Sequence, residues 1–500
     1  MRKILLASAF ILFGQMSQAE TAITIYSKAQ PGAISPMQYR PVPGQANYYD
    51  SQSIPGYAVV RDIREVDLPS KHTSLKFQDV AAMLDPTTVQ FRSLTDPKGT
   101  KVAEQNYQFD LVNRDKMLQK YIDKKISVEQ LIGDKITLVT GTLMSTDGGL
   151  TLKMDDGQIQ ILGNYSNIKF PELAGGLITK PTLVWDIFTE KPGKQKAEVA
   201  YQTEGITWWA DYNLTYREGK NANSGVVDFG SWVSIINQSG TTYTDAKLKL
   251  MAGDVQRAQP QALYDGVGMA RAEMKAAPMA APSFAEKAFF EYHLYTLSRP
   301  ATLPQNSTKQ LELIPAAVNI PVEKLYVYEN GSPWYGYANY DQSYGATGDT
   351  KIGVFLKLEN KKENGLGVPL PAGRIRVNQR DDDGSLEFVG EDIINHTAEK
   401  EKVLVKLGNA FDVVGERKQT DFKYDSTRKT IEEEYEIKLR NHKKSDVNIL
   451  VSENLGRGVN WEILDSNEKW KKENSQKIEF NIPVKADGEQ VVKYRVRYSW

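Results

Sequence analysis

Alternating apolar and polar residues dominate the central part of the chain and predict β-strands. Between residues 206 and 216, one set of alternate positions is apolar or aromatic and the other set is mainly polar, which is the period of a half-buried strand. A second strand is expected at 232–237, and 247–250 alternates again after turn residues at 238–240. We therefore expect an antiparallel sheet with one solvent-exposed face. The apolar set of the first strand comprises Ile206, Trp208, Ala210, Tyr212, Leu214 and Tyr216.

The same period recurs near the C-terminus. Charged residues alternate there with Ile431, Glu433, Tyr435, Ile437 and Leu439. Residues 441–446 are expected to turn the chain back into a further strand at 447–451, which predicts a hairpin of an antiparallel sandwich.

The N-terminal third predicts short strands, one helix and a compact hairpin module. The stretch 31–57 is rich in Tyr, Pro and Gly and lacks a period, so we expect a loop. Asp110 is expected to cap a helix that runs through Leu118, Tyr121 and Ile122. Between 135 and 170, Asp-Gly turns join short strands, a pattern that fits a small SH3-like barrel.

These patterns predict a mostly β protein with several antiparallel, immunoglobulin-like β-sandwiches, a small SH3-like barrel and one or two short helices. The expected units are an N-terminal β domain over 20–118, the small barrel-like module over 119–172, and sandwiches over 197–320 and 321–500. The Ala-, Met- and Pro-rich stretch 259–285 has neither period nor caps, and we expect it to be a mobile insertion.

The first nineteen residues have the pattern of a secretory signal peptide. Basic Arg2 and Lys3 precede an apolar run, and small residues at Ser17 and Ala19 predict a mature chain that begins at Glu20. The apolar run is about ten residues, shorter than the roughly 20 that span a bilayer as a helix, so no transmembrane helix is expected. We therefore expect an exported protein that is periplasmic or associated with the outer membrane.

Composition excludes several classes of function. The chain has no cysteine, which excludes disulfides, thiolate nucleophiles and zinc–thiolate sites. Lys and Arg number 62 against 63 Asp and Glu, so no basic field favours binding of a nucleic acid.

Several short motifs follow one another in the C-terminal part of the chain. They lie at 205–212, 239–254, 368–373, 388–391, 407–413 and 440–443. In these motifs the chain resembles exported bacterial proteins that carry the domain of unknown function DUF4139, over about 197–500 and more weakly upstream. The resemblance implies β-sandwich modules and an envelope location, and it supplies no activity, catalytic residue or cofactor.

The strongest candidate for binding is an aromatic stretch at 333–344 that has neither helical nor strand period. Its rings are Trp334, Tyr335, Tyr337, Tyr340 and Tyr344. Aromatic side chains on loops bury much area at a low entropy cost, so they make effective binding surfaces for proteins or sugars. The alternative is that these rings fold back over the neighbouring sandwich, because large aromatic residues are usually buried.

Residues that often bind metals show no ligand spacing. The four histidines, His72, His293, His396 and His442, are scattered along the chain, and we interpret them as structural. The acidic run 381–383 lacks the spaced ligands of a calcium loop and predicts a solvated hairpin turn. No metal site and no cofactor are expected.

The favoured function is a non-catalytic exported scaffold or binding protein that presents loops to an envelope protein or glycan. No catalytic motif is found, and the oligomeric state is left open. One alternative is an outer-membrane β-barrel, suggested by the alternation of Tyr494, Val496, Tyr498 and Trp500. A second alternative is an envelope hydrolase whose carboxylates are brought together only by folding.

Overall fold

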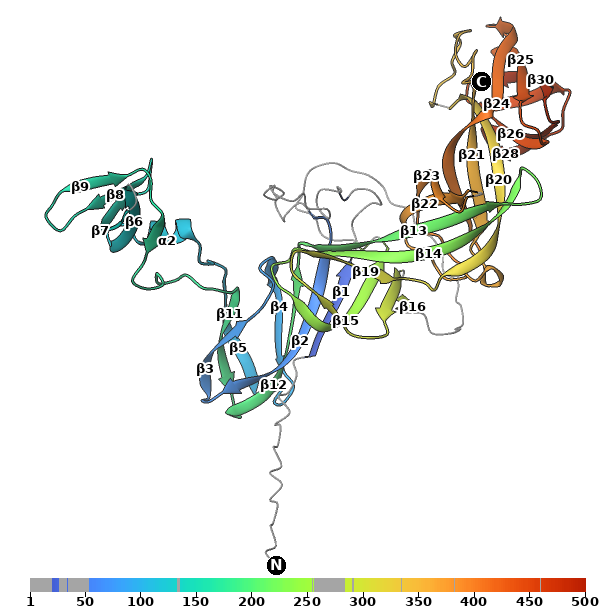
Figure 1. Cartoon of the computed structure of the whole chain (residues 1–500). Helices are drawn as coiled ribbons and strands as arrows, with labels where there is room; N and C mark the ends of the chain where they lie inside the picture. The colour runs from blue at the N-terminus through green and yellow to red at the C-terminus, as the bar shows by residue number, and fades with distance from the viewer. Residues whose placement is uncertain are drawn as a thin grey trace, which may run out of the picture.

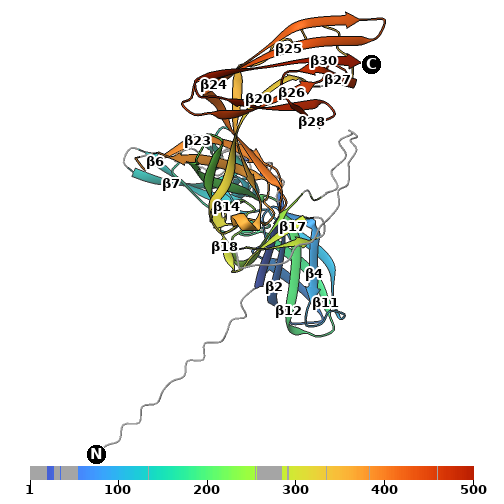
Figure 2. The ribbon, with the colours of Figure 1, turned by 90° about the vertical axis from the view of Figure 1, so that its right-hand side faces the viewer.

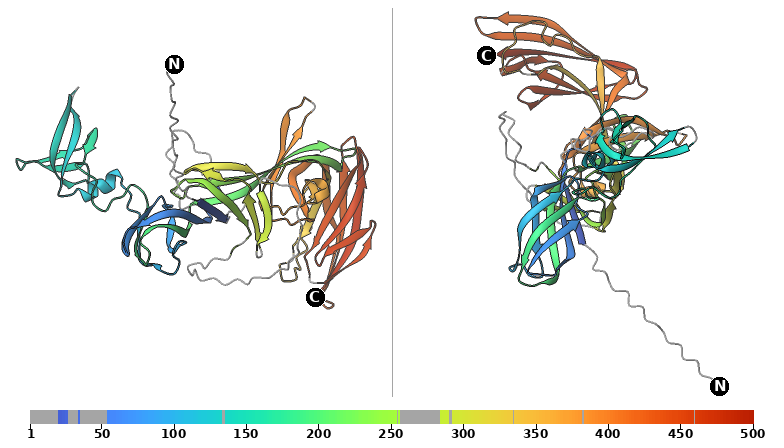
Figure 3. Two further views of the ribbon diagram at one scale, coloured as in Figure 1. Left: turned by 90° about the horizontal axis from the view of Figure 1, so that it is seen from below. Right: turned by 90° about the vertical axis from the view of Figure 1, so that its left-hand side faces the viewer.

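The computed structural model describes residues 20–26, 34, 54–132, 135–253, 255, 284–289, 292–333, 335–381, 383–458 and 460–500. The predicted signal peptide and residues 259–283 of the predicted insertion lie outside these ranges. Strands make up 66% of the described structure and helices 2%, which confirms the mostly β class. The molecule is elongated, with a small module at one end and the C-terminal sandwich at the other (Figures 1 and 3).

An eight-stranded sheet and a three-stranded sheet form the N-terminal sandwich. The larger sheet has the order β16-β17-β15-β1-β2-β12-β4, with β18 paired to β15. Its strands are β1 (Glu20–Tyr26), β2 (Tyr57–Leu68), β4 (Leu84–Ser93), β12 (Gly193–Thr203), β15 (Tyr243–Ala252), β16 (Phe284–Phe289), β17 (Tyr292–Leu297) and β18 (Ala301–Leu303). The smaller sheet consists of β3 (His72–Gln78), β11 (Thr182–Thr189) and β5 (Thr100–Gln108). Trp185 of β11 joins the two sheets, because its ring contacts Phe77 and Phe91 at centroid distances of 5.4 and 5.1 Å.

The small module is inserted between β5 and β11, which pair with each other. Its five-stranded sheet has the order β10-β6-β7-β8-β9 and is open, since β10 and β9 do not pair in the described residues. The small barrel predicted for 119–172 is therefore not closed, because hairpin turns fix which strands are neighbours but not whether the two edge strands meet. The strands are β6 (Lys125–Ile132), β7 (Lys135–Ser145), β8 (Leu150–Lys153), β9 (Ile159–Leu162) and β10 (Asn167–Lys169). The Asp-Gly turns predicted between the strands are confirmed, because Gly148 and Gly157 adopt φ angles of 67° and 88° in the β7–β8 and β8–β9 turns.

The predicted helix exists, but its cap was assigned to the wrong residue. Helix α2 (Arg114–Lys120) begins after Asn113, whose side chain accepts the Lys116 N–H at 2.9 Å. Asp110 instead pairs with the Lys116 ammonium at 2.8 Å. Several residues near 110 can act as N-caps, so the apolar stripe located the helix but not its first turn.

A fourteen-stranded sheet runs through the rest of the chain. Its main order is β23-β22-β13-β14-β20-β21-β24-β25-β30-β27, with β19, β26, β28 and β29 attached at the side. The strands are β13 (Ile206–Glu218), β14 (Ser224–Asn237), β19 (Ser307–Glu312), β20 (Ala317–Ser332), β21 (Lys351–Glu359), β22 (Gly373–Arg380), β23 (Leu386–Ile394), β24 (Lys402–Asp425), β25 (Thr430–Asn441), β26 (Val447–Leu455), β27 (Asn460–Ser466), β28 (Trp470–Asn474), β29 (Lys477–Val484) and β30 (Gly488–Ser499). A short 3-10 helix, η2 (Lys362–Asn364), follows β21.

The strands predicted from alternation are present, and their apolar faces are buried as expected. The opposite face of β13 is less exposed than predicted, because Asp211 is buried and accepts a hydrogen bond from the Ser234 hydroxyl at 2.8 Å. Arg376 of the parallel neighbour β22 lies 3.3 Å from the same carboxylate. A network of polar side chains therefore covers part of this face.

Two predicted chain reversals do not form hairpins. After 238–240 the chain enters β15, which belongs to the eight-stranded sheet, and β14 pairs with other strands. After 441–446 it enters β26, which pairs with β20 and β29 rather than with β25. Alternation fixes which face of a strand is buried but not which strand is its neighbour, so a crossing between layers looks like a hairpin in sequence.

The long strands of the fourteen-stranded sheet continue into a sandwich formed by the C-terminal part of the chain, the C-terminal sandwich. In this sandwich, β24, β25, β30 and β27 form one layer and β20, β26, β29 and β28 form the other. The two layers meet at Phe480 and Tyr494, whose ring centroids lie 5.7 Å apart. Ile320 of β20 packs in the hydrophobic core that the N-terminal sandwich shares with β13 and β14, and Tyr326 of the same strand packs in the core of the C-terminal sandwich. Figure 2 shows β20 running from the middle of the molecule into this sandwich. Among the described residues, no helix has the length and hydropathy needed to cross a membrane.

Candidate functional site

The predicted aromatic stretch lies between β20 and β21, at the C-terminal sandwich. We call residues 335–345 the aromatic loop. The side chains of Tyr335 and Tyr337 are 64% and 66% exposed, which is unusual for rings of this size. Trp334 lies outside the described residues. The loop therefore presents at least two large rings to solvent.

Tyr340 is part of an aromatic cluster that also includes residues from β24 and the C-terminus. Its ring centroid lies 5.4 Å from that of Tyr424 and 4.9 Å from that of Trp500. Tyr424 and Trp500 are nearly parallel, with an interplanar angle of 19°. Tyr340 nevertheless remains 46% exposed, so the cluster continues the aromatic surface onto the sandwich.

Tyr344 closes the loop against the sandwich and is half-buried. Its hydroxyl donates to the Pro333 carbonyl at 2.8 Å, which joins the two ends of the loop. The guanidinium carbon of Arg457 lies 5.5 Å from its ring centroid. Of the four described rings, Tyr335 and Tyr337 therefore point to solvent, whereas Tyr340 and Tyr344 pack on the C-terminal sandwich.

Beneath the loop lie four buried ionisable side chains, which we call the buried charge cluster. Its members are Arg417 of β24, Glu433 of β25, Glu453 of β26 and Arg457, which follows β26. Their side chains are at most 2% exposed, and they form two ion pairs with N–O distances of 2.8 Å (Arg417–Glu453) and 2.7 Å (Arg457–Glu433). Alternation places Glu433 on the inward face of β25 between Ile431 and Tyr435.

Arg457 holds the backbone of the aromatic loop. One terminal nitrogen donates to the carbonyls of Asn339 and Asp341 at 3.0 and 2.6 Å, and the other donates to the carbonyl of Tyr344 at 2.6 Å. The carbonyl of Arg457 in turn accepts the Asn339 N–H at 3.0 Å. A single buried side chain therefore satisfies three carbonyls of a loop that has no strand partner at these positions.

Arg417 makes a second set of contacts from the other side. It donates to Glu453 at 2.8 Å and to the carbonyl of Gly345, and its guanidinium carbon lies 3.7 Å from the centroid of the Tyr435 ring. The Tyr494 hydroxyl donates to Glu453 at 2.5 Å. Gly345 has a φ of 68°, a conformation that glycine adopts without strain, and it ends the loop directly over Arg417.

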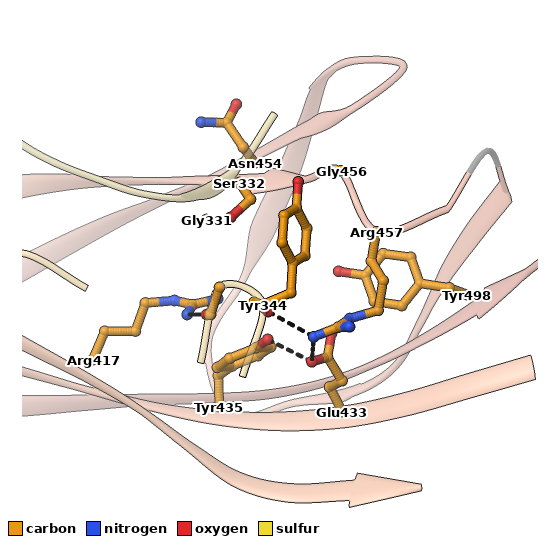
Figure 4. A pocket seen from close by; sticks show the side chains of 11 residues that line it. Gly331, Ser332, Tyr344, Arg417, Glu433, Tyr435, Asn454, Gly456, Arg457 and Tyr498 are labelled. Carbon is orange, nitrogen blue, oxygen red and sulfur yellow. Dashed lines mark hydrogen bonds and ion pairs between the residues drawn. The ribbon is translucent and has the colours of Figure 1, made fainter. Parts of the chain in front are cut away.

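A small pocket that is open to solvent lies between the loop and the buried charge cluster. Tyr344, Arg417, Glu433, Tyr435 and Arg457 contribute to its lining. Figure 4 shows the contacts of Arg457 with Tyr344 and Glu433, and of Tyr435 with Glu433. Among the described residues, one oxygen of Glu453 and the Nε of Arg457 are buried without a hydrogen-bond partner, so the cluster is not fully satisfied there.

The electrostatics of the cluster favour the charged arginines and the neutral tyrosine. Burial alone would lower the pKa of Arg457, but the hydrogen bond and charge of Glu433 outweigh it and raise the pKa. Burial, followed by the charge of Glu433, raises the pKa of Tyr435 to about 12. The hydroxyl of Tyr435 therefore remains a donor to Glu433 at 2.8 Å over the physiological pH range.

Three of the four histidines have structural partners for their side chains, and the backbone N–H of His442 donates to the Asp412 carbonyl at 2.8 Å. His72 pairs with Asp186, His293 lies 2.7 Å from Glu286, and His396 accepts the Ala372 N–H at 3.1 Å. Asp381 and Asp383 lie in the turn between β22 and β23, and Asp382 is outside the described residues. In the part of the chain that the structure describes, no three His, Asp or Glu residues gather as potential metal ligands.

Sequence reasoning missed the buried charge cluster, although one signal for it was present. Glu433 is the only acidic residue on the apolar face predicted for 431–439. A carboxylate on such a face needs a cationic or hydrogen-bonding partner, because an unpaired buried charge is costly. Arg457 gave no comparable signal, since it lies in a Gly-rich turn where arginine is normally solvated.

The loop and the cluster fall within one recognised domain. A family model described as a domain of unknown function, DUF4139, matches residues 197–500. The chain belongs to the DUF4139 family. This membership confirms the resemblance found in the sequence, and a comparison with curated proteins finds no match. The DUF4139 domain begins within β12 and contains the whole C-terminal sandwich.

Proposed function

We propose that this protein is a non-catalytic, exported envelope protein that binds a partner protein through the aromatic loop. The observation that carries the proposal is the combination of exposed rings with a backbone that is held from beneath. Tyr335 and Tyr337 are solvent-exposed, while Arg457 bonds the carbonyls of Asn339, Asp341 and Tyr344. A surface of this kind loses little conformational entropy when it binds.

The residue types favour a protein partner over a glycan. Tyrosine and tryptophan are enriched at protein interfaces, because each has a large apolar face, a polar edge and few rotatable bonds. The aromatic loop has three exposed tyrosines and adjoins Trp500. The buried carboxylates of Glu433 and Glu453 are paired with arginines, so we assign them no acid–base role in hydrolysis.

The export of the protein is supported by its N-terminal sequence. The basic start, the apolar run and the small residues at Ser17 and Ala19 are typical of a secretory signal. The absence of cysteine from the sequence is compatible with folding in an oxidising compartment, where free thiols are a liability.

Position-specific photocrosslinking in the native host tests the proposal. A photoreactive phenylalanine at position 337 is compared with the same group at position 188, since Phe188 is an exposed aromatic residue of β11 in the N-terminal sandwich. We expect a protease-sensitive adduct of defined mass from position 337 only. Equal adducts from both positions, or none from position 337, would contradict the proposal, and a protease-resistant adduct would identify a glycan instead.

A matched pair of variants measures the contribution of the rings. Replacing Tyr335 and Tyr337 together by Ser is expected to weaken capture of the partner by roughly 30-fold, the effect of losing about 2 kcal/mol at an interface. The variant Phe188→Ser removes an exposed ring elsewhere and is expected to leave capture unchanged.

A further inference from the structure

We infer that Arg457 is a positioning residue for the aromatic loop and that Glu433 orients Arg457 for this role. The inference rests on the proposed function, because it concerns how the binding surface is kept in its binding conformation. It concerns residues that lie beneath the surface and that a partner would not touch, since both side chains are at most 2% exposed.

The loop depends on Arg457 for several of its backbone hydrogen bonds. The guanidinium reaches the carbonyls of Asn339, Asp341 and Tyr344, which are three different points along the loop. Within the loop, turn contacts are short-range, such as the Tyr344 N–H with the Asp341 carbonyl at 3.1 Å. Without Arg457 the carbonyls of Asn339 and Tyr344 would have to find water, and the loop would open to do so.

Burying an ion pair in a protein core often adds no stability relative to apolar residues of similar size, because desolvation offsets the attraction. The C-terminal sandwich nevertheless buries two pairs side by side, and both arginines also contact carbonyls of residues 339–345. Apolar side chains could not donate hydrogen bonds to these carbonyls. The two buried arginines can, and in this way they order the loop.

A guanidinium is planar and carries its donors in a fixed fork, so Arg457 can contact Glu433 and three carbonyls at once. A lysine ammonium is a compact point charge on a flexible stem and cannot span these acceptors. The structure therefore distinguishes arginine from lysine at this position, which a charge requirement alone would not.

Glu433 keeps other donors when Arg457 is removed, which makes the variants practicable. The same carboxylate oxygen also accepts from Gln419 and from the Tyr435 hydroxyl at 2.7 and 2.8 Å. We therefore design three variants, Arg457→Lys, Arg457→Met and the double variant Glu433→Met with Arg457→Met. The control is Arg495→Met, because Arg495 pairs with Asp421 and Glu434 on the outer side of the same sandwich.

The test combines urea unfolding with backbone hydrogen exchange in the full-length protein. We expect both Arg457→Lys and Arg457→Met to raise exchange across 339–345 at least tenfold, whereas Arg495→Met leaves it unchanged. The double variant is expected to recover global stability without recovering protection of the loop. That separation marks a positioning role, because a merely structural role would restore both properties together.

Crosslinking from position 337 completes the test. In the proposed account its yield falls in the Arg457 variants and in the double variant, although no ring that touches the partner has changed. Unchanged exchange across 339–345 in a folded Arg457→Met protein, or recovery of loop protection in the double variant, would overturn the inference. Loss of loop protection together with no adduct in the unmodified chain would overturn the proposed function and leave the ordering by Arg457 in place.

Discussion

The small module and the C-terminal sandwich are both built on mainly antiparallel sheets, yet they distribute polarity in opposite ways. The described residues of the module, between 114 and 178, include no buried polar or charged side chain, and its core is entirely apolar. Its outer face exposes large aliphatic residues, among them Ile136, Leu138 and Ile161. The C-terminal sandwich instead buries four charged side chains beneath a loop of exposed rings.

The comparison shows that buried charge is not needed to hold such a sheet together in this protein. The module encloses Leu143, Leu150 and Leu152 without any ion pair in its core. In the C-terminal sandwich, Arg417 and Arg457 direct their remaining donors to the carbonyls of Gly345, Tyr344 and neighbouring loop residues. In this protein the buried charges therefore accompany the ordering of the aromatic loop and not the packing of the sheets.

The largest expected effect comes from Arg457→Met, which removes the cationic partner of Glu433 and one donor from each of three loop carbonyls. Removing one partner of a buried ion pair typically costs about 3–5 kcal/mol. Tryptophans also occur in other sheets, in β11, β13 and β14, so fluorescence would not single out the C-terminal sandwich. Hydrogen exchange of β24, β25 and β26 at increasing urea concentrations measures the loss there instead. A loss below about 0.5 kcal/mol, typical of a surface substitution, would contradict the assigned contacts.

The reciprocal change is Leu152→Ala in the core of the module. Leu152 is fully buried among apolar neighbours, and deleting such a side chain typically costs about 2–5 kcal/mol. We expect faster hydrogen exchange throughout the module and no change across 339–345. If the aromatic loop also lost protection, the two regions would be coupled and the comparison would fail.

Alkaline pH is expected to destabilise the C-terminal sandwich. The pKa of buried Tyr435 is raised to about 12, so the folded state keeps a proton that the unfolded state loses near pH 10. Its contribution is fully present below pH 10 and is lost as the pH rises toward 12, by at most about 1.4 kcal/mol for each pH unit. Unfolding titrations at pH 9, 10 and 11 measure this slope, and Tyr435→Phe should reduce it. An identical slope in that variant would assign the effect to other tyrosines.

The smallest expected effect is that of Ile161→Thr on the outer face of the module. Ile161 is 69% exposed, so its removal creates no cavity and the change in stability should stay within about 0.5 kcal/mol. Hydrogen exchange of β9 and its neighbour β8 checks this. A loss of several kcal/mol would mean that the outer face is covered by something the described residues do not include.

The faces of the strands could be predicted from the sequence, but their neighbours could not. The apolar sets of 206–216 and 431–439 are buried as expected, because the period of two fixes which side chains face the core. The alternation predicts that the chain returns to the same antiparallel sheet after 238–240 and forms a hairpin at 441–446, whereas both turns lead into other layers. Local turn chemistry is the same in both cases, and only long-range packing decides between them.

Only the surface part of the candidate site, the aromatic stretch, could be predicted from the sequence. The aromatic stretch stood out because five rings occur there without a period, and the described rings lie as a loop between β20 and β21. The distribution of those rings, outward for Tyr335 and Tyr337 and inward for Tyr344, depends on Arg457, which is more than a hundred residues away in sequence. Contacts between such distant residues leave no trace in a single sequence.

Backbone hydrogen exchange across residues 339–345, compared between the unmodified protein and Arg457→Met, tests the central claim most directly. The account predicts protected amides in the unmodified protein, including those of Asn339 and Tyr344, whose N–H groups have carbonyl partners at 3.0 and 3.1 Å. It also predicts exchange close to the unprotected rate in the variant, with the small module unchanged in both. A loop that exchanges freely in the unmodified protein, or that stays protected without Arg457, would show that the buried charges do not order the aromatic surface.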